Sequence, residues 1–151
     1  MAFAPASFDV IWSEGAIYNL GFENGLRIVK DFVKPGGYVA VSEVVWLKSD
    51  PPVRVAEFWK QYPEIDSIEN KLAVIDRLGY ERAGHFVLPK TTWTADYYDP
   101  METLIAQKST DWAGNPDAMA VLTEAQNEIE IFREYSDYYS YVFFVMRRPV
   151  V

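Results

Sequence analysis

The residues FDVIWSEGA, numbers 8–16, hold the first strong structural signal in this chain of 151 residues. The segment Val10–Trp12 is a short apolar run of β-branched and aromatic side chains, typical of a strand buried on both faces. It ends abruptly in the polar and small residues Ser13–Ala16. Ligands of open parallel α/β sheets bind just beyond the carboxyl ends of the strands, so Glu14 and Gly15 are well placed for chemistry. Alternatively, Glu14 caps the next helix and Gly15 only eases a turn.

The residues that follow this strand, which we place at Asp9–Trp12, predict a βαβ unit. Apolar side chains recur at helical spacing from Leu26 to Val33, and the sequence KPGG at 34–37 ends that helix in a tight turn. Tyr38–Trp46 is then nearly all apolar in its first half, as expected of a central parallel strand. Two strands joined through one helix in this way predict a right-handed crossover.

Helices and strands continue to alternate in the remainder of the chain. Proline and capping residues, together with apolar spacing, predict helices that begin at SDPP (49–52), near Ile68, at Thr94 and at Asn115-Pro116. Gly79 is the predicted C-terminal cap of the second of these helices. Apolar segments predict two more strands, at Arg82–Leu88 and Tyr138–Met146. No linker divides the chain, which we interpret as one domain, residues 1–151.

Composition excludes several classes of function. The chain has 14 basic and 22 acidic residues, a formal net charge of −8, which disfavours a nucleic-acid binder. It has no cysteine and a single histidine, so no thiolate or paired-histidine metal site is expected. No apolar run approaches the ~20 residues of a membrane helix, and the first residues do not resemble a signal peptide. We therefore expect a cytoplasmic protein without a membrane partner. Aromatic residues make up 16% of the chain, and a cluster of them at a cleft would suit a flat organic substrate.

Residues 8–12 and the segment FVKPGGYVAVSE, residues 32–43, together resemble the second half of a class I S-adenosylmethionine-dependent methyltransferase. In that family the two segments are strands four and five, with a Lys-Pro-Gly-Gly turn before strand five. The segment WSEGAIYN, residues 12–19, is similar to a subgroup that acts on small molecules. The resemblance implies an α/β fold: a partial Rossmann-like sheet, mostly parallel, with an antiparallel C-terminal strand inserted and helices on both faces. Arg82–Leu88 and Tyr138–Met146 would be strands six and seven.

The chain departs from the family in one respect. The family's glycine-rich turn after strand one, which lets the backbone approach the cofactor closely, has no counterpart here. The chain therefore resembles the C-terminal portion of a methyltransferase domain, with strands one to three absent. In the complete fold, strand four lies beside strand one, so the Asp9–Trp12 strand would have an exposed edge, a template for association. We expect this edge to form a homodimer or to be covered by another segment.

The resemblance also assigns candidate site residues. Ser13, Glu14 and Gly15 would border the transferable methyl group of S-adenosylmethionine, with Glu14 as the catalytic base or as a hydrogen-bond partner of an amine. The candidate acceptor-binding residues are Tyr18, Asn19, Glu43, Trp46, Trp93 and Tyr97. The alternatives are a capping role for Glu14, a solvated strand-end carboxylate for Glu43, and simple packing for the aromatic residues.

These observations predict methyl transfer to a small-molecule acceptor in the complete protein, with the activity lost or impaired in this chain. The alternative is a non-catalytic, self-associating α/β remnant. A nicotinamide-dependent reductase shares the sheet type, but the chain has neither a glycine fingerprint nor a Tyr-x-x-x-Lys pair.

Overall fold

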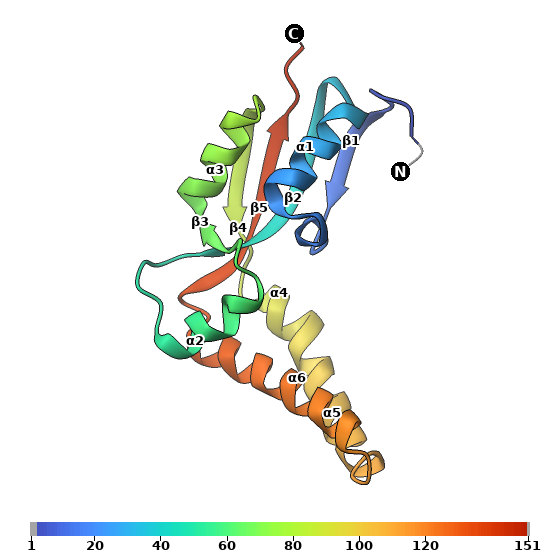
Figure 1. Cartoon of the computed structure of the whole chain (residues 1–151), viewed down its shortest axis with the longest axis vertical. Helices are drawn as coiled ribbons and strands as arrows, with labels where there is room; N and C mark the ends of the chain where they lie inside the picture. The colour runs from blue at the N-terminus through green and yellow to red at the C-terminus, as the bar shows by residue number, and fades with distance from the viewer. Residues whose placement is uncertain (1–2, 151) are drawn as a thin grey trace.

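A mixed β-sheet runs through the computed structural model, which describes residues 3–150 (Figure 1). The strands are Phe8–Ser13 (β1), Val33–Trp46 (β2), Asp66–Ser67 (β3), Glu81–Val87 (β4) and Tyr139–Arg147 (β5). The helices are Phe22–Phe32 (α1), Val53–Phe58 (α2), Ile68–Arg77 (α3), Thr91–Trp93 (α4), Asp99–Asp111 (α5) and Pro116–Tyr135 (α6). No helix in this part of the chain is long and apolar enough to cross a bilayer.

The strand order is β1-β2-β5-β4, with the short β3 beside β2. β1 and β3 run parallel to β2, whereas β5 is antiparallel to both of its neighbours, β2 and β4. The parallel pairing of the first two predicted strands is confirmed, and so is the insertion of an antiparallel C-terminal strand. Because the four pairings divide equally between the two orientations, the predicted mostly parallel sheet is not confirmed, and the sheet is mixed.

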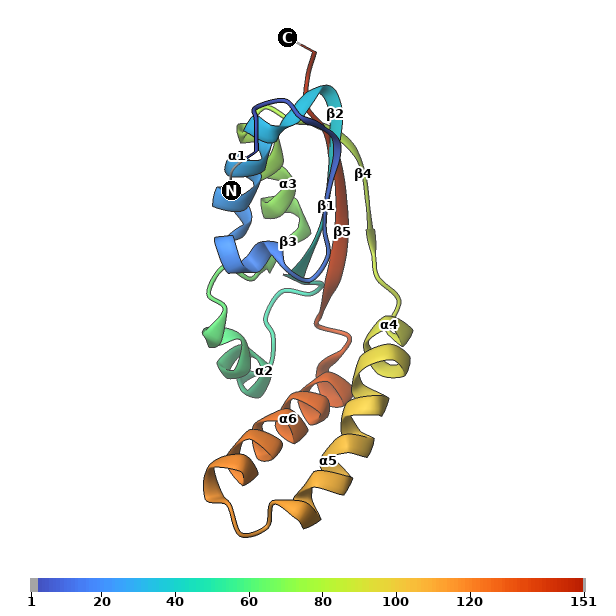
Figure 2. The same ribbon diagram turned by 90° about the vertical axis from the view of Figure 1, so that its right-hand side faces the viewer.

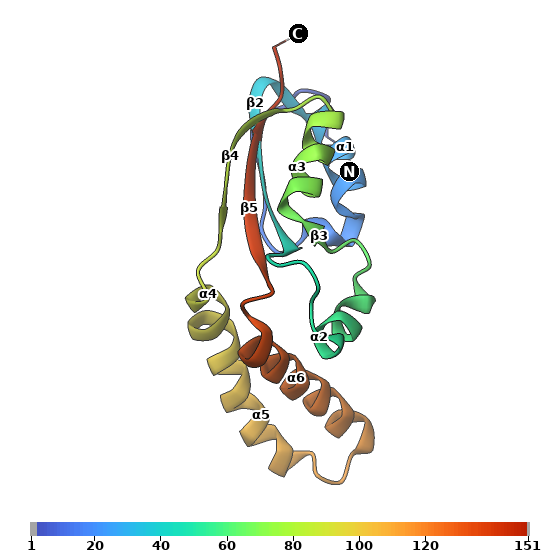
Figure 3. The ribbon, with the colours of Figure 1, turned by 90° about the vertical axis from the view of Figure 1, so that its left-hand side faces the viewer.

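Helices α1 and α3 lie on the same face of the sheet (Figures 2 and 3). The prediction of helices on both faces is wrong for the described residues, because on the opposite face Trp12 is 63% exposed and Phe86 54% exposed. The reason is topological: the connections from β1 to β2 and from β2 to β4 cross the sheet in the same direction. Two crossovers of the same hand and direction place both of their helices on one side.

The main core lies between this pair of helices and the sheet. Leu26 and Val29 of α1 pack with Val39 and Val41 of β2 and with Phe144 of β5, all of them buried. Full burial of each such side chain stabilises the fold by about 1.5–3 kcal/mol. The period-two alternation of β2 therefore fixes which of its side chains face the helices.

The turn between α1 and β2 differs in detail from the prediction. The helix ends at Phe32, earlier than the predicted KPGG stop, and residues 34–37 belong to the extended segment that begins β2. A Cβ atom on Gly37 would lie 2.7 Å from the backbone oxygen of Asp9 in β1. A glycine at this position therefore permits the close approach of the first two strands, beyond its role in the turn.

The other predicted helix signals were confirmed in part. The Asn115 side chain accepts a hydrogen bond from the Ala118 N–H at 3.2 Å and caps α6, and Gly79 follows α3 with a φ of +69°. By contrast, α2 begins only at Val53, after both prolines. Thr94 is not a cap, because it begins a π-helical turn, Thr94–Tyr98, that joins α4 to α5 without a break.

Helices α5 and α6 form an antiparallel hairpin that extends beyond the end of the sheet (Figures 1 and 2). Ile105 of α5 and Leu122 and Ile129 of α6 are buried in a second apolar cluster, which reaches Trp93 and Tyr139. This cluster fixes the base of the hairpin against the end of the sheet, beside the carboxyl ends of β1 and β2.

Candidate functional site

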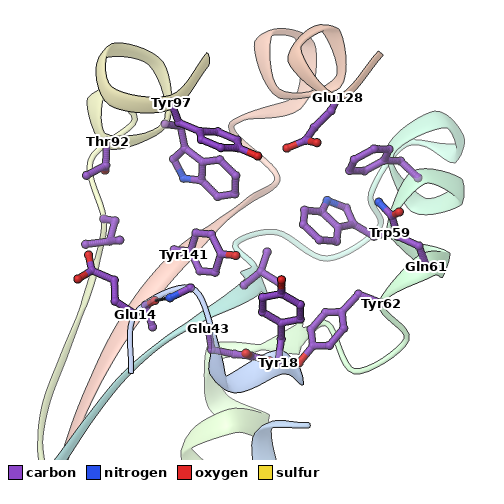
Figure 4. A pocket seen from close by; sticks show the side chains of 16 residues that line it. Glu14, Tyr18, Glu43, Trp59, Gln61, Tyr62, Thr92, Tyr97, Glu128 and Tyr141 are labelled. Carbon is purple, nitrogen blue, oxygen red and sulfur yellow. Dashed lines mark hydrogen bonds between the residues drawn. The ribbon is translucent and has the colours of Figure 1, made fainter. Parts of the chain in front are cut away.

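A cavity of about 580 Å³ lies at the carboxyl ends of β1 and β2, between the sheet and the helical segments α2, α4 and α6 (Figure 4). Its volume is in the range of small-molecule sites, roughly 300–1,000 Å³. Open α/β sheets bind ligands at this end of their strands. The cavity therefore lies where the sequence predicts chemistry.

The loop after β1 forms one rim of the cavity. Gly15 adopts a φ of +55°, and its N–H donates a hydrogen bond to Ser42 Oγ at 2.7 Å, which ties the loop to β2. A Cβ atom at this position would contact nothing, so the backbone conformation and not space explains the glycine. The exposed Glu14 carboxylate accepts a hydrogen bond from Trp12 Nε1 at 3.3 Å. Glu14 does not cap a helix here, because the turn that follows has no side-chain cap.

Glu43 lies in the floor of the cavity and is only 1% exposed. Its Oε1 accepts hydrogen bonds from Tyr62 OH and from Lys71 Nζ, both at 2.6 Å, whereas its Oε2 is buried without a partner. The alternative of a solvated strand-end carboxylate is therefore wrong. Burial raises the pKa of Glu43, and the Lys71 ammonium opposes that shift.

Lys71 completes this buried polar group from α3. Its ammonium also donates to the Glu64 carbonyl at 2.7 Å and lies 4.6 Å from the centroid of the Phe22 ring. The Glu64 carboxylate in turn accepts a hydrogen bond from the Phe22 N–H at 2.8 Å, at the start of α1. Three elements, α1, β2 and α3, are thereby joined beneath the cavity, and Tyr62 is held as part of its wall.

Aromatic side chains form most of the remaining wall. Trp93 is stacked between Phe132, at 5.0 Å, and Tyr141, at 4.8 Å, and its indole is only 7% exposed. Burial, followed by the charge of Glu43, raises the pKa of Tyr141 to about 12. Its phenol is therefore neutral at physiological pH and can donate a hydrogen bond.

Glu128 of α6 is the acidic residue on the far side of the cavity. Its carboxylate points toward the open space between Tyr97 and Trp59 (Figure 4). Tyr98 OH donates a hydrogen bond to its Oε1 at 3.1 Å. Burial raises the pKa of Glu128, and the bond from Tyr98 opposes that shift.

The structure brings six of the nine predicted site residues to this cavity: Glu14, Gly15, Tyr18, Glu43, Trp93 and Tyr97. The other three do not line it. Ser13 lines an apolar groove beside β1, and the Asn19 amide donates to the Ala16 carbonyl at 3.1 Å. Trp46 packs edge-on against Tyr139 within the second core cluster, at the end of β2 beyond the lining residues Ser42 and Val44.

Sequence reasoning missed ten of the lining residues, among them Trp59, Tyr62, Tyr141 and Glu128. The apolar spacing around Trp59 is typical of the inner face of a helix, and Glu128 lies off the apolar stripe of its helix. The spacing of apolar residues could not reveal that the hairpin lays that side of α6 over a cavity. Among residues 3–150, no group of His, Cys, Asp and Glu side chains is arranged to hold a metal ion.

Solved structures of S-adenosylmethionine-dependent methyltransferases share this fold. The methyltransferase from Geobacter sulfurreducens in complex with S-adenosyl-L-homocysteine matches 95% of this chain with a TM-score of 0.76 and 18% identity. The corresponding complex from Thiobacillus denitrificans matches 95% with a TM-score of 0.72 and 17% identity. Phosphoethanolamine N-methyltransferase 2 from Haemonchus contortus, in complex with S-adenosyl-L-methionine, matches 97% with a TM-score of 0.71 and 20% identity.

The chain has the α/β fold of class I S-adenosylmethionine-dependent methyltransferases, which confirms the resemblance seen in the sequence at the level of the fold. It spans 34% of the Haemonchus chain and 59% of each of the other two. No family model and no curated protein sequence matches it.

Proposed function

We propose that this chain is the acceptor-binding portion of a cytoplasmic S-adenosylmethionine-dependent methyltransferase that acts on a small molecule. The main support is the cavity, which combines a position at the carboxyl ends of parallel strands with a helical cover from α4 and α6. Chains with this fold bind S-adenosylmethionine or its product in the solved structures. Fold alone does not define chemistry, so the proposal depends on the site.

The residues present fit one side of a methyl donor. The loop from Ser13 to Gly15 would border it, because Glu14 has an exposed carboxylate and Gly15 opens onto free space. None of the described glycines forms a Gly-x-Gly turn at this end of the sheet, so the opposite side of a donor site is lacking in residues 3–150. When bound, the donor supplies an electrophilic methyl group on a sulfonium.

The residues of the chain would position the acceptor and handle its proton. The aromatic walls would orient it toward the rim at Glu14, and effective orientation is a large part of catalysis for an in-line displacement. Glu14 would remove a proton from the acceptor or hold it by a hydrogen bond. The Glu43–Lys71 pair would keep Tyr62 in place as a wall of the acceptor site.

We further propose that residues 1–151 form the C-terminal portion of the domain and have impaired activity by themselves. The test is calorimetric titration of S-adenosylhomocysteine into this chain and into a chimera in which strands one to three of the Geobacter neighbour precede Phe8. Binding by the chimera alone supports the proposal. Full affinity in the chain alone would contradict the impairment, and no binding by either protein would contradict the role of residues 13–15. The last result would favour the non-catalytic remnant.

We also propose that residues 1–151 form a homodimer through the free edge of β1. In the described residues β1 pairs only with β2, so its other edge has no partner strand. Beside this edge lies an apolar groove of about 370 Å³, lined by Phe8, Ile11, Leu20 and Phe32 among others. A second copy could pair its own β1 with this edge and cover the groove.

A further inference from the structure

The cavity has an unbalanced charge. Its lining includes Glu14, Glu43 and Glu128 but no lysine or arginine. Lys71 lies 2.6 Å from Glu43 and balances that carboxylate. Glu14 and Glu128 form no ion pair with any residue in the described range. The site therefore presents uncompensated negative charge to whatever molecule enters it.

Glu128 is the more unusual of the two carboxylates, because it is half-buried among aromatic rings. Its only hydrogen bond to the described residues is the one that Oε1 accepts from Tyr98 OH, and this leaves Oε2 unpaired. A carboxylate removed from water is costly unless it meets a cation or several donors. The chain provides no cation at this position, so a ligand is the natural source of one.

The aromatic groups that line the cavity between Glu128 and the opposite wall carry no charge of their own but have ring faces available. Tyr97 and Tyr18 are 48% and 46% exposed and lie on opposite sides of the opening, and Trp59 closes a third side (Figure 4). Burial raises the pKa of Tyr97 and of Tyr141, so both phenols stay protonated at neutral pH. Such rings attract alkylammonium groups through their π faces.

We propose that the cavity binds its acceptor as an organic ammonium ion, with the Glu128 carboxylate as counter-ion and Tyr97, Tyr18 and Trp59 as an aromatic cage for the alkyl groups. An acceptor bearing a phosphate or a carboxylate near Glu128 is disfavoured, because no cationic side chain lines the cavity. The identification of this ligand as the acceptor rests on the proposed methyltransferase function. The proposal that the cavity binds an ammonium ion does not depend on that function.

The test uses a pair of probes that differ only in charge. Choline and 3,3-dimethylbutan-1-ol have the same shape, with a quaternary nitrogen in one and a carbon in the other. Each is titrated into the full chain, and binding is followed by the tryptophan fluorescence and by NMR shifts of the aromatic protons. We expect choline to bind at least ten-fold more tightly than its neutral isostere. Equal affinity for the two probes, or no saturable binding of choline at millimolar concentration, would overturn the proposal.

Variants locate the interaction. Glu128→Gln keeps the hydrogen bond from Tyr98 and removes the charge, and should weaken choline binding about ten-fold while leaving the isostere unaffected. Glu124→Gln, an exposed change one helical turn earlier in α6, is the matched control and should change neither probe. Tyr97→Leu replaces a ring face with an apolar chain at an exposed position, and should weaken choline by about five-fold. A loss of choline binding in Glu124→Gln equal to that in Glu128→Gln would contradict the assignment.

The two levels of the proposal fail in different ways. Choline binding without any S-adenosylhomocysteine binding, even in the chimera, leaves the ammonium site standing and removes the methyltransferase proposal. Binding of S-adenosylhomocysteine by the chimera with no preference for choline leaves the methyltransferase proposal standing and removes the ammonium site. Displacement of choline by S-adenosylmethionine but not by S-adenosylhomocysteine would assign the cage to the sulfonium of the donor and would overturn its assignment to the acceptor.

Discussion

At the scale of single residues, the burial of Glu128 opposes its ionisation. Its pKa in the folded protein is raised above that of an ordinary carboxyl group, chiefly by burial. The folded state therefore holds more protons on this residue than the unfolded state does between the two pKa values, so stability falls as the pH rises through that window. Its stabilising contribution is fully present only below the unfolded value, about 4.3.

Glu128→Gln should remove this dependence. The variant keeps an acceptor for Tyr98 and has no charge to bury, so we expect it to be more stable than the parent at pH 7, with the difference vanishing near pH 4. Urea unfolding at the two pH values measures the effect. A variant that is less stable than the parent at pH 7 would show that the carboxylate stabilises the fold. Higher stability together with weaker choline binding would be the signature of a residue retained for function.

The Glu43–Lys71 pair, in contrast to Glu128, is expected to stabilise the fold. Both side chains are under 5% exposed, and removal of one partner leaves the other buried alone. We expect Lys71→Met to destabilise the protein by about 3 kcal/mol. The double change Glu43→Leu with Lys71→Met should recover most of that loss, since it leaves no uncompensated charge. Thermal and urea unfolding of the single and double variants form the cycle, and a cost below about 1 kcal/mol for Lys71→Met would contradict the role of the pair.

Part of the site could be predicted from single residues. Glu14, Gly15 and Glu43 were identified because they lie on or directly after strands whose apolar pattern was clear. Glu128 and Tyr141 gave no such signal. The first lies off the apolar stripe of a helix, where charged residues normally face water, and the second lies within a strand that reads as core. Both residues line the cavity because of where the helical hairpin packs against the sheet. Such long-range packing leaves no local pattern in the sequence.

At the scale of elements, the sequence predicted the order of strands and helices because their periodicities are strong. The errors have local physical causes. Thr94 resembles an N-cap, but a π-helical turn continues the helix through it, and α2 starts late because two successive prolines hold the chain extended. The helices on one face follow from the direction of the crossovers, which became clear only once the strand order was known.

Gly37 provides an element-scale prediction, because it sets the distance between β1 and β2. A methyl group there would lie 2.7 Å from the Asp9 carbonyl oxygen and 2.9 Å from the Val33 side chain. Gly37→Ala should therefore cost about 1–3 kcal/mol by pushing the two strands apart. Gly84→Ala in β4 is the matched control, since a Cβ there contacts nothing within 4 Å, and it should stay within about 0.5 kcal/mol of the parent. Similar costs for the two variants would contradict a steric role for Gly37.

At the scale of the whole molecule, the two edges of the sheet differ. Both edge strands have a register shift, between Phe8 and Val10 in β1 and between Arg82 and Gly84 in β4, but only β4 places two charged residues, Glu81 and Arg82, at its start, which discourages strand addition. β1 has an apolar centre, with Val10 54% exposed and Trp12 63% exposed, and an apolar groove at its side. If either edge associates, the physical chemistry of the strands favours β1.

This asymmetry predicts which substitution changes the oligomeric state. Val10→Lys introduces a charge on the exposed face of β1, beside the groove, and should convert a dimer of residues 1–151 into a monomer, because a lysine on an edge strand opposes pairing. Phe86→Lys, at an equally exposed apolar position on β4, should leave the dimer intact. Sedimentation velocity across micromolar to millimolar concentrations measures both. A parent chain that stays monomeric over this range would contradict the dimer, and dissociation by Phe86→Lys alone would move the interface to the other edge. In the chimera that carries strands one to three, β1 has a partner strand within the same chain, so Val10→Lys should no longer alter the oligomeric state and should destabilise the fold instead.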